Sequence, residues 1–363
     1  MLEKISQIFK FKPKNFLGVD IGDSSVRIVE LSKKGQGYRL ENYGEMKWKK
    51  ETNEPLRSIT KRSAFKLSNR DISENINKIL KAAEIKTREA CFSIPDFGTF
   101  FTNVDLPIME EDEIEQAVRY QVRPYIPLSL SDVTLDWSII EGEPNKTKLR
   151  VLVVAIPNTV IASYKEIAQA TELDLKFLEP EIFPLVRSSI KNGEEKKTIA
   201  LIDMGATSTT CSVLENKIVK VSHSFNLAGN ELTDLIAKSL NIDYNKAEDL
   251  KIKEGLLPSS EVENSKNIRN LLSPLVDAMI DEIKKAFRSF YLQEGREVEK
   301  IILSGGLSVM PGLKEVFAVE FKKPVLVIDP FAEIETHSAL ASILKEKGPY
   351  YGVAIGLALK GLE

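Results

Sequence analysis

Residues that commonly ligate metals or form covalent cross-links are scarce in this sequence of 363 residues. Cysteine occurs only at Cys91 and Cys211, and histidine only at His223 and His337. Two distant cysteines inside apolar runs exclude a disulfide framework and a cysteine-rich zinc site, and they are typical of a reducing cytosol. A histidine-rich metal centre is not expected either.

Long hydrophobic runs and an excess of one charge are also missing. No apolar run approaches the ~20 residues that span a bilayer. Lys and Arg together number 50 and Asp and Glu 53, which gives a net charge of -3. A charge of that size does not attract nucleic acid or anionic lipid to the whole surface. We therefore expect a cytoplasmic protein that binds no nucleic acid and meets a membrane only through partners.

The first twelve residues are basic but contain no continuous apolar stretch, so they do not form a secretory signal. Leu2, Ile5, Ile8 and Phe9 fall on one face of a possible helix, with lysines elsewhere. This pattern is typical of a segment that lies on a membrane surface or docks on a protein. The sequence leaves the role of this segment open.

A length of 363 residues allows two or three domains with buried cores, and 43% hydrophobic and 28% charged residues are ordinary for a globular protein. Residues 16–20, 26–31 and 38–48 predict three strands in an antiparallel meander. After a polar stretch, Lys191–Lys197, the same pattern recurs at 198–203, 209–214 and 217–225. Two copies of one unit predict a duplicated α/β fold with a cleft between its halves.

Between the repeats, the sequence predicts a strand, helix, strand, strand block that interrupts the first half. We expect the first half to comprise residues 1–87 and 173–195, and an inserted, peptide-binding subdomain to comprise residues 88–172. The second half should cover 196–335, with a helical lobe at about 229–292. Residues 336–363 should contain a C-terminal helix that packs back on the first half.

The strongest candidate site lies in the repeated unit, where each copy has an Asp-x-Gly turn after an apolar strand. The first turn supplies Asp20, Gly22, Ser24 and Ser25, and the second supplies Asp203, Gly205 and Thr207. Glycine permits a tight turn, and the following amides and hydroxyls can converge on phosphate oxygens. The aspartates can hold Mg²⁺ through water. A single such turn is usually a polar hairpin tip, but two turns facing across a cleft favour phosphate binding.

Two further glycine sites follow. Gly305-Gly306 comes after an apolar strand. Because glycine has no side chain, the flat base of a nucleotide could lie on this backbone. The alternative is a plain strand-to-helix turn. Gly229-Asn230 precedes a predicted helix, and Lys251 could reach a ribose or phosphate, although a solvated lysine is commoner. Arg27, on the strand after the first turn, completes the nucleotide-binding candidates.

The order of these sites resembles the actin-like ATPase superfamily, which includes actin and sugar kinases, and the glycine sites look like its phosphate and adenosine motifs. The segment from Leu106 to Leu128 resembles the SHS2-type subdomain that the FtsA and PilM families insert into this fold. The Tyr125-Ile-Pro turn, Val133–Ile139, Glu179-Pro180 and Gly352–Gly361 are similar to the PilM family of type IV pilus assembly proteins. The resemblance implies an actin-like, duplicated RNase H-like ATPase fold.

The resemblance also implies ATP and Mg²⁺ as cofactors, with Asp20 and Asp203 holding Mg²⁺ through water. Glu179 and Asp203 match catalytic positions of the superfamily. Many ATPases of the superfamily have a run of glycines and a second aspartate in their second phosphate motif. At the matching positions this sequence has Gly205-Ala-Thr207 and Thr210. Since phosphoryl transfer depends on positioning and charge neutralisation, these departures predict ATP binding with at most slow hydrolysis.

The function implied by the resemblance is that of a cytoplasmic, ATP-binding platform at the inner face of the inner membrane. It would bind the cytoplasmic tail of the inner-membrane protein PilN and connect the inner-membrane complex to the pilus motor ATPase. The sequence leaves open whether the protein forms a homo-oligomer. The alternatives are an FtsA-like cell-division or filament-forming ATPase and a phosphotransferase. FtsA proteins carry a C-terminal amphipathic anchor that is not found after Gly361, and no general-base aspartate for a phosphotransferase stands out.

Overall fold

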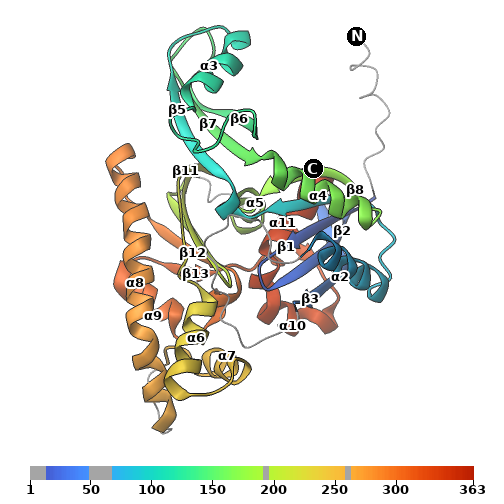
Figure 1. The fold of residues 1–363 in the computed structure, drawn as a ribbon, viewed down its shortest axis with the longest axis vertical. Coiled ribbons are helices and arrows are strands. Elements are labelled where there is room, and N and C mark those ends of the chain that lie inside the picture. Colours follow the sequence, from blue (N-terminus) through green and yellow to red (C-terminus); the bar gives the residue numbers. More distant parts are fainter. Residues whose placement is uncertain (1–13, 49–67, 191–195, 258–262) are drawn as a thin grey trace.

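A computed structural model describes residues 14–48, 68–190, 196–257 and 263–363. The amphipathic pattern at Leu2–Phe9 and most of the predicted hinge, residues 191–195, lie outside these residues. The described chain forms three β-sheets with helices packed around them (Figure 1).

The first half is built on a six-stranded sheet with the order β14-β3-β2-β1-β4-β8. Its strands are β1 (Asn15–Ile21), β2 (Ser25–Lys34), β3 (Gly37–Lys47), β4 (Glu89–Ile94), β8 (Asp174–Pro180) and β14 (Ile334–Glu335). The first three pair antiparallel as the predicted meander, while β4 is parallel to both β1 and β8. One face carries α2 (Asn69–Ala82) and α4 (Asn158–Ala170), which bury apolar residues against it.

The second half repeats this arrangement in a five-stranded sheet with the order β11-β10-β9-β12-β13. Its strands are β9 (Ile199–Met204), β10 (Thr209–Glu215), β11 (Ile218–Phe225), β12 (Lys300–Ser304) and β13 (Val325–Val327). The repeat extends to the turns, because Gly22 N–H donates to Ser25 O at 3.0 Å and Gly205 N–H donates to Ser208 O at 3.0 Å. The predicted duplication and the α/β class of the fold are confirmed.

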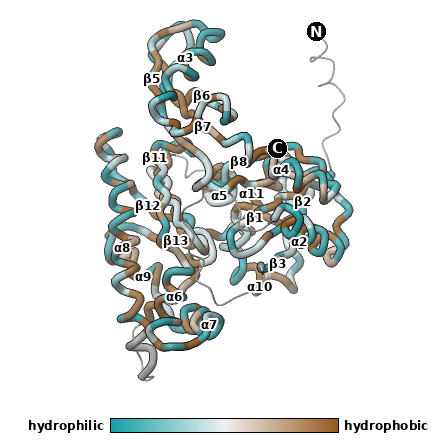
Figure 2. Tube along the Cα trace, viewed as in Figure 1, coloured by the Kyte–Doolittle hydropathy of each residue, from teal (hydrophilic) through white to brown (hydrophobic). Residues whose placement is uncertain are grey.

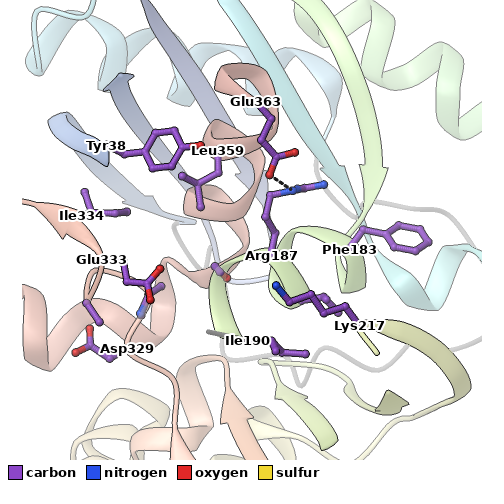
Figure 3. A pocket seen from close by; sticks show the side chains of 14 residues that line it. Tyr38, Phe183, Arg187, Ile190, Lys217, Asp329, Glu333, Ile334, Leu359 and Glu363 are labelled. Atoms are coloured by element: carbon purple, nitrogen blue, oxygen red, sulfur yellow. Dashed lines mark ion pairs between the residues drawn. The ribbon is translucent and has the colours of Figure 1, made fainter. Parts of the chain in front are cut away.

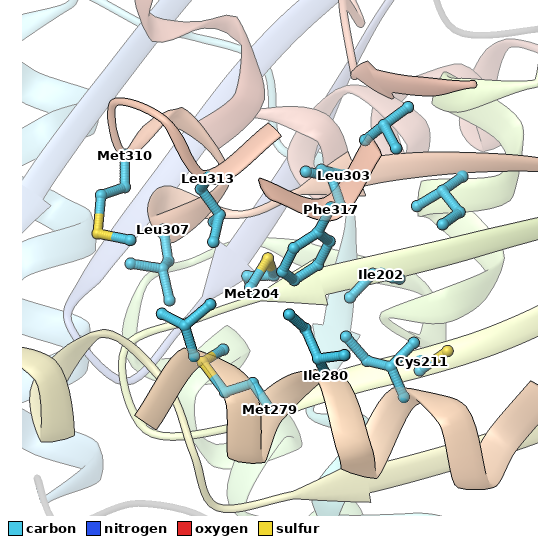
Figure 4. Close-up of a cluster of buried hydrophobic side chains, with 14 of the residues drawn as sticks. Ile202, Met204, Cys211, Met279, Ile280, Leu303, Leu307, Met310, Leu313 and Phe317 are labelled. Atoms are coloured by element: carbon cyan, nitrogen blue, oxygen red, sulfur yellow. The ribbon is translucent and has the colours of Figure 1, made fainter. Parts of the chain in front are cut away.

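Helices α8 (Glu263–Glu294) and α9 (Leu313–Phe321) pack on the second sheet, α6 (Gly229–Leu240) packs on α8, and α7 (Tyr244–Lys253) packs on α6. The long helix α8 lies along the outer side of the sheet, and hydrophobic and hydrophilic residues alternate along it (Figures 1 and 2). Its apolar side, with Met279 and Ile280, packs with strand residues such as Ile202 and with Phe317 of α9 (Figure 4). Periodic apolar residues therefore set which side of α8 is buried.

The inserted subdomain is a three-stranded sheet with β7 (Leu149–Pro157) between β5 (Phe100–Leu106) and β6 (Val133–Glu141), covered by α3 (Ile114–Gln121). It projects away from the two halves (Figure 1). The predicted bounds of this subdomain, residues 88–172, are too wide. They include β4, which pairs inside the six-stranded sheet, and α4, which packs on α2 of the first half. The other predicted domain boundaries stay predictions.

Two helices hold the centre of the molecule: α5 (Ile182–Ser189) and α11 (Gly352–Leu362). They pack on each other, and α11 also lies against β1 and β4. Their apolar residues join one core with residues of both halves, such as Leu31 and Leu201. A short helix, α10 (Ala341–Lys347), precedes α11. Among the helices of the described ranges, none combines the length and apolar character needed to cross a membrane.

Candidate functional site

The two Asp-x-Gly turns meet between the halves. Asp20 stands opposite Arg27 in the β1–β2 pair, and Asp203 stands opposite Thr210 in the β9–β10 pair. The hydroxyl of Thr207 in the second turn donates a hydrogen bond to the carboxylate of Asp23 in the first. The fold thus brings together two turns that lie far apart in the sequence.

Four acidic side chains gather behind these turns, and we call them the carboxylate cluster: Asp20, Asp96, Glu181 and Asp203. Asp20 accepts a hydrogen bond from the Ser93 hydroxyl at 2.9 Å and lies 3.6 Å from Arg27. Asp96 and Glu181 hold each other in place. The Asp96 amide donates to Glu181 at 3.2 Å, and the Asp96 carboxylate accepts from the Ile182 amide at 3.2 Å. Asp96 and Glu181 are site residues that the sequence did not single out, because each follows a strand without a recognisable motif.

Burial and mutual repulsion raise the pKa of every carboxyl group in the cluster. Desolvation is the main cause throughout. It raises the pKa of Asp203 to about 6, helped by the negative charge of Asp20, and that of Asp96 to about 8. The pKa of Glu181 is raised further by the charges of Asp96, Asp20 and Asp203, whereas Arg27 and Ser93 partly oppose the upward shift of Asp20. Such a cluster favours a cation or a proton in its centre.

These shifts predict how stability depends on pH in the absence of nucleotide and divalent cations. A carboxyl group with a raised pKa in the folded state contributes stability at low pH, which is lost as the pH rises through that pKa. The free energy of unfolding should therefore fall between about pH 4 and pH 8, the window set by Asp203 and Asp96. Asp96→Asn should reduce this loss by on the order of 1–3 kcal/mol at pH 8. Denaturant unfolding at pH 5 and pH 8 measures it.

An exposed aspartate provides the control for this measurement. Asp136→Asn on β6 should keep the wild-type pH dependence, because that side chain is exposed. If Asp96→Asn and wild type lose stability equally between pH 5 and pH 8, Asp96 does not titrate in that range and the description of the cluster is wrong.

The first turn has polar groups suited to phosphate. The Ser25 hydroxyl is fully buried and makes no hydrogen bond to any described residue. A buried polar atom without a partner is costly, so it points to a missing acceptor or donor. Trp48 fixes the turn by donating from its indole nitrogen to Gly22 O at 2.8 Å and from its amide to Ser24 O at 3.0 Å. The Ser24 side chain is exposed beside it.

The double glycine lies directly against the second turn. Gly305 has φ +81°, and a Cβ there would lie 2.5 Å from Met204 O and 2.7 Å from an Asp203 carboxylate oxygen. A Cβ at Gly306 would lie 3.0 Å from the ring of Tyr350. That ring also packs under the Arg27 guanidinium, 5.6 Å from its centroid. Tyr350 is therefore another residue at the site that sequence analysis missed, since nothing in its local sequence connects it with Gly306.

The start of α6 closes the second turn from the other side. Gly229 N–H donates to Gly205 O at 3.1 Å, and Asn230 N–H donates to Ala206 O at 2.8 Å. The Asn230 side chain accepts a hydrogen bond from the Tyr244 hydroxyl at 2.6 Å. Both predicted residues thus support the turn through their backbone.

Lys251 differs from its predicted role. Its ammonium group is buried and donates to Gly229 O at 3.0 Å, to the Thr233 hydroxyl at 2.9 Å and to Glu248 at 2.7 Å. A lysine ammonium has three donors, and all three are used here. Lys251 therefore fixes the start of α6 and has no donor left for a ribose or phosphate.

Glu179, the predicted catalytic carboxylate, lies outside the carboxylate cluster. Arg187 binds both of its oxygens, at 3.1 and 3.2 Å, and also donates to Gly356 O on α11 at 2.8 Å. The chain turns from β8 into α5 directly after Pro180, so Glu181 reaches the cluster instead. The position of Glu179 thus does not support its predicted role.

The cluster is compatible with a metal ion held through water. Among residues of the described segments, no three Asp, Glu, His or Cys side chains are placed to ligate a metal directly. Mg²⁺ usually keeps several waters and takes only one or two carboxylates. Asp20 and Asp203 fit that indirect mode, and the raised pKa of both groups gives a cation a favourable place.

Solved structures share this architecture. The chain matches a structure described as a PilM-PilN type IV pilus biogenesis complex with a TM-score of 0.80 and 22% identity, over 97% of this chain and 99% of that one. An MreB protein of Spiroplasma citri bound to AMPPNP matches with a TM-score of 0.54 and 14% identity, over 95% of both chains. At these identities the likeness shows the actin-like fold.

Sequence relatives narrow the assignment. The cell division protein FtsA of Enterococcus faecalis is 26% identical over 191 residues, which span 46% of this chain and 42% of FtsA. FtsA of Streptococcus pneumoniae is 21% identical over 85% of this chain and 74% of its own length. The family described as "Type IV pilus assembly protein PilM" matches residues 18–362. This chain therefore belongs to the PilM family of type IV pilus assembly proteins.

Proposed function

We propose that this protein binds Mg-ATP between its two halves and serves as a cytoplasmic platform of the type IV pilus machinery. The observation that carries the proposal is the meeting of the two Asp-x-Gly turns at the carboxylate cluster, where Thr207 contacts Asp23. The buried Ser25 hydroxyl and the Gly305 backbone supply the kinds of group that phosphate and Mg²⁺-bound water need. The structures of nucleotide-bound actin-like proteins support the same ligand class.

In this proposal the second turn positions phosphate through the Gly205 and Thr207 region, and Asp20 and Asp203 hold Mg²⁺ through its waters. Gly306 and the adjacent Tyr350 form the wall next to the base. The bound ion would neutralise phosphate charge, and Arg27 would keep Asp20 oriented from 3.6 Å.

Turnover is proposed to be slow. Thr210 stands opposite Asp203, and its hydroxyl is paired with the Ser224 hydroxyl at 2.9 Å, so no second carboxylate is available there. Glu179 is held by Arg187. Glu181 is the remaining carboxylate near both aspartates, and its burial raises its pKa, which disfavours the ionised form that a general base needs.

ATP binding is testable by thermal unfolding. A ligand that binds only the folded state stabilises it by ~2.7 kcal/mol at one hundred times Kd. We expect Mg-ATP to raise the melting temperature of the wild type, and ATP with EDTA to raise it less. Asp203→Asn should lose the Mg²⁺-dependent part of the gain, because the neutral amide cannot stabilise the hydrated ion.

Asp249→Asn is the matched control, since Asp249 is an exposed carboxylate of α7, and it should respond to Mg-ATP like the wild type. Absence of any shift or calorimetric signal with ATP in the wild type would contradict the proposed ligand. Rapid phosphate release that is lost in Glu181→Gln but kept in Glu179→Gln would contradict slow turnover.

We further propose that the protein binds the cytoplasmic N-terminal peptide of PilN, meets the inner membrane through that partner and connects it to the pilus motor ATPase. The relative solved as a PilM-PilN complex supports this partner. The inserted subdomain offers a surface for it. Four large side chains near α3 stay exposed: Ile108, Tyr120, Tyr125 and Leu128. Other aromatic residues of the insertion are less available to a peptide. Phe100 and Trp137 pack on the core of the subdomain, and Phe101 packs on Phe183. The Phe97 side chain lies outside the described residues.

A further inference from the structure

A pocket of about 480 Å³ lies where the chain passes between the two halves, at α5 and at residues 329–334, and we call it the hinge pocket. Its walls come from α5, the end of α11, the start of β3 and residues 329–334, which lead from β13 to β14 (Figure 3). It shares no lining residue with the carboxylate cluster. Its size falls in the range of about 300–1,000 Å³ that is typical of ligand pockets.

The lining combines an apolar floor with unpaired acidic groups. Tyr38, Val186, Ile190 and Leu359 are among the apolar lining residues. Asp329 and Glu333 lie on one side of the pocket, across from Arg187 and Lys217 (Figure 3). Both carboxylates are exposed, and neither forms a hydrogen bond or ion pair with another part of the described chain. Arg187, in contrast, is held by Glu179 and by Glu363 at 3.5 Å.

An occupant that fits this lining has large apolar side chains next to positive charges. Residues 1–13 of this chain have that composition: Leu2, Ile5, Ile8, Phe9 and Phe11 alternate with Lys4, Lys10 and Lys12. The only acidic residue among them is Glu3. The charge of the segment therefore complements Asp329 and Glu333.

The segment also starts within reach of the pocket. β1 begins at Asn15, which pairs with Ser32 of β2, and Lys33 of β2 pairs with Tyr38 in the pocket wall. Two strand spacings, about 10 Å, separate β1 from β3. Thirteen residues can extend to about 40 Å. A tethered segment acts at a millimolar effective concentration, so a few contacts are enough to hold it.

We propose that residues 1–13 dock in the hinge pocket of the same molecule, with apolar side chains on its floor and lysines beside Asp329 and Glu333. Since the pocket is lined both by α5 and by residues 329–334, the two places where the chain passes between the halves, the docked segment bridges the halves at their hinge. This inference goes beyond the proposed function and does not depend on ATP or PilN binding.

Disulfide trapping in the full-length protein tests the docking. Cys91 and Cys211 are fully buried and burial raises the pKa of both thiols, so introduced cysteines react selectively. One cysteine replaces Ile5, Ile8 or Phe9, and a second replaces the exposed pocket residue Ala332. We expect an intramolecular disulfide in at least one pair to form tenfold faster or more than with the control position, Lys86→Cys.

Lys86 is a stringent control, because it is exposed near the start of β4, one strand from β1, and outside the pocket. Asp329→Lys/Glu333→Lys should slow the trapping, whereas Glu111→Lys/Asp112→Lys, an equal charge change on the inserted subdomain, should not. Equal rates at Ala332 and Lys86 would overturn the proposal, as would a disulfide that forms only between molecules.

Discussion

Replacing Gly18 with alanine is expected to lower the free energy of unfolding by at least about 3 kcal/mol, as severe overpacking does. Gly18 lies in the middle of β1, where α11 rests directly on the strand. A Cβ there would lie 1.8 Å from the carbonyl oxygen of Ala354 and 2.7 Å from the amide nitrogen of Ala358. Backbone atoms cannot rotate away, so α11 as a whole must move. Because α11 joins the core shared by both halves, the loss should be cooperative.

Chemical denaturation of the purified variant, or its soluble yield if it does not accumulate, measures this effect. Gly37→Ala is the control, since a Cβ at that position has no neighbour closer than 3.8 Å. It should leave the unfolding midpoint nearly unchanged. A wild-type midpoint for Gly18→Ala would mean that α11 does not pack on β1 in the way described.

Removing the inserted subdomain is expected to abolish binding of the PilN N-terminal peptide and to leave Mg-ATP binding in place. The structure indicates where to cut. Asn103 of β5 pairs with Leu152 of β7, so a two-residue turn can replace residues 104–151. Phe101, Val154 and Ile156, which pack on the halves, are kept. A wider deletion over residues 90–170 would also remove β4 and the cluster residue Asp96, and ATP binding with them.

Retained Mg-ATP binding by the deletion variant is the required control for folding. The deletion also removes Arg150 and Glu141, which contact Glu294 and Lys220 of the second half at 2.6 Å each. Tyr120→Ser/Tyr125→Ser provides a milder test: peptide affinity should fall at least about tenfold if these exposed rings are anchors. Tyr291→Ser on α8, where the ring is also exposed, should not change it. Equal peptide binding by the deletion variant would place the docking surface on the actin-like halves.

Much of the fold follows from local sequence features. The apolar, β-rich runs within 16–48 and 198–225 specify two similar meanders, because short apolar runs bounded by turn residues form strands that are buried on both faces. The repeated Asp-x-Gly turns indicate the duplication and the position of the phosphate-binding candidates. Asp20, Ser25, Asp203 and Thr207 could therefore be selected from the sequence, since turn chemistry depends on adjacent residues.

The site residues that were missed or misplaced depend on contacts between distant segments. Glu179 and Glu181 both follow the same apolar run, and only the bend from β8 into α5 sends Glu181 to the cluster and Glu179 to Arg187. Tyr350 reaches Gly306 through packing across the molecule. Lys251 looked like a free cation, but folding of α7 onto α6 buries it on Gly229 O.

The sequence by itself therefore determined the duplicated actin-like halves, the inserted block and the two Asp-x-Gly turns, because each rests on a periodicity or a turn of a few adjacent residues. Only the tertiary structure decided that β4 belongs to the six-stranded sheet and that Asp96 joins the carboxylate cluster. Parallel pairing of β4 with β1 and β8 joins residues more than fifty positions apart. Such pairings are set by the combined packing of several elements, for which no local pattern exists.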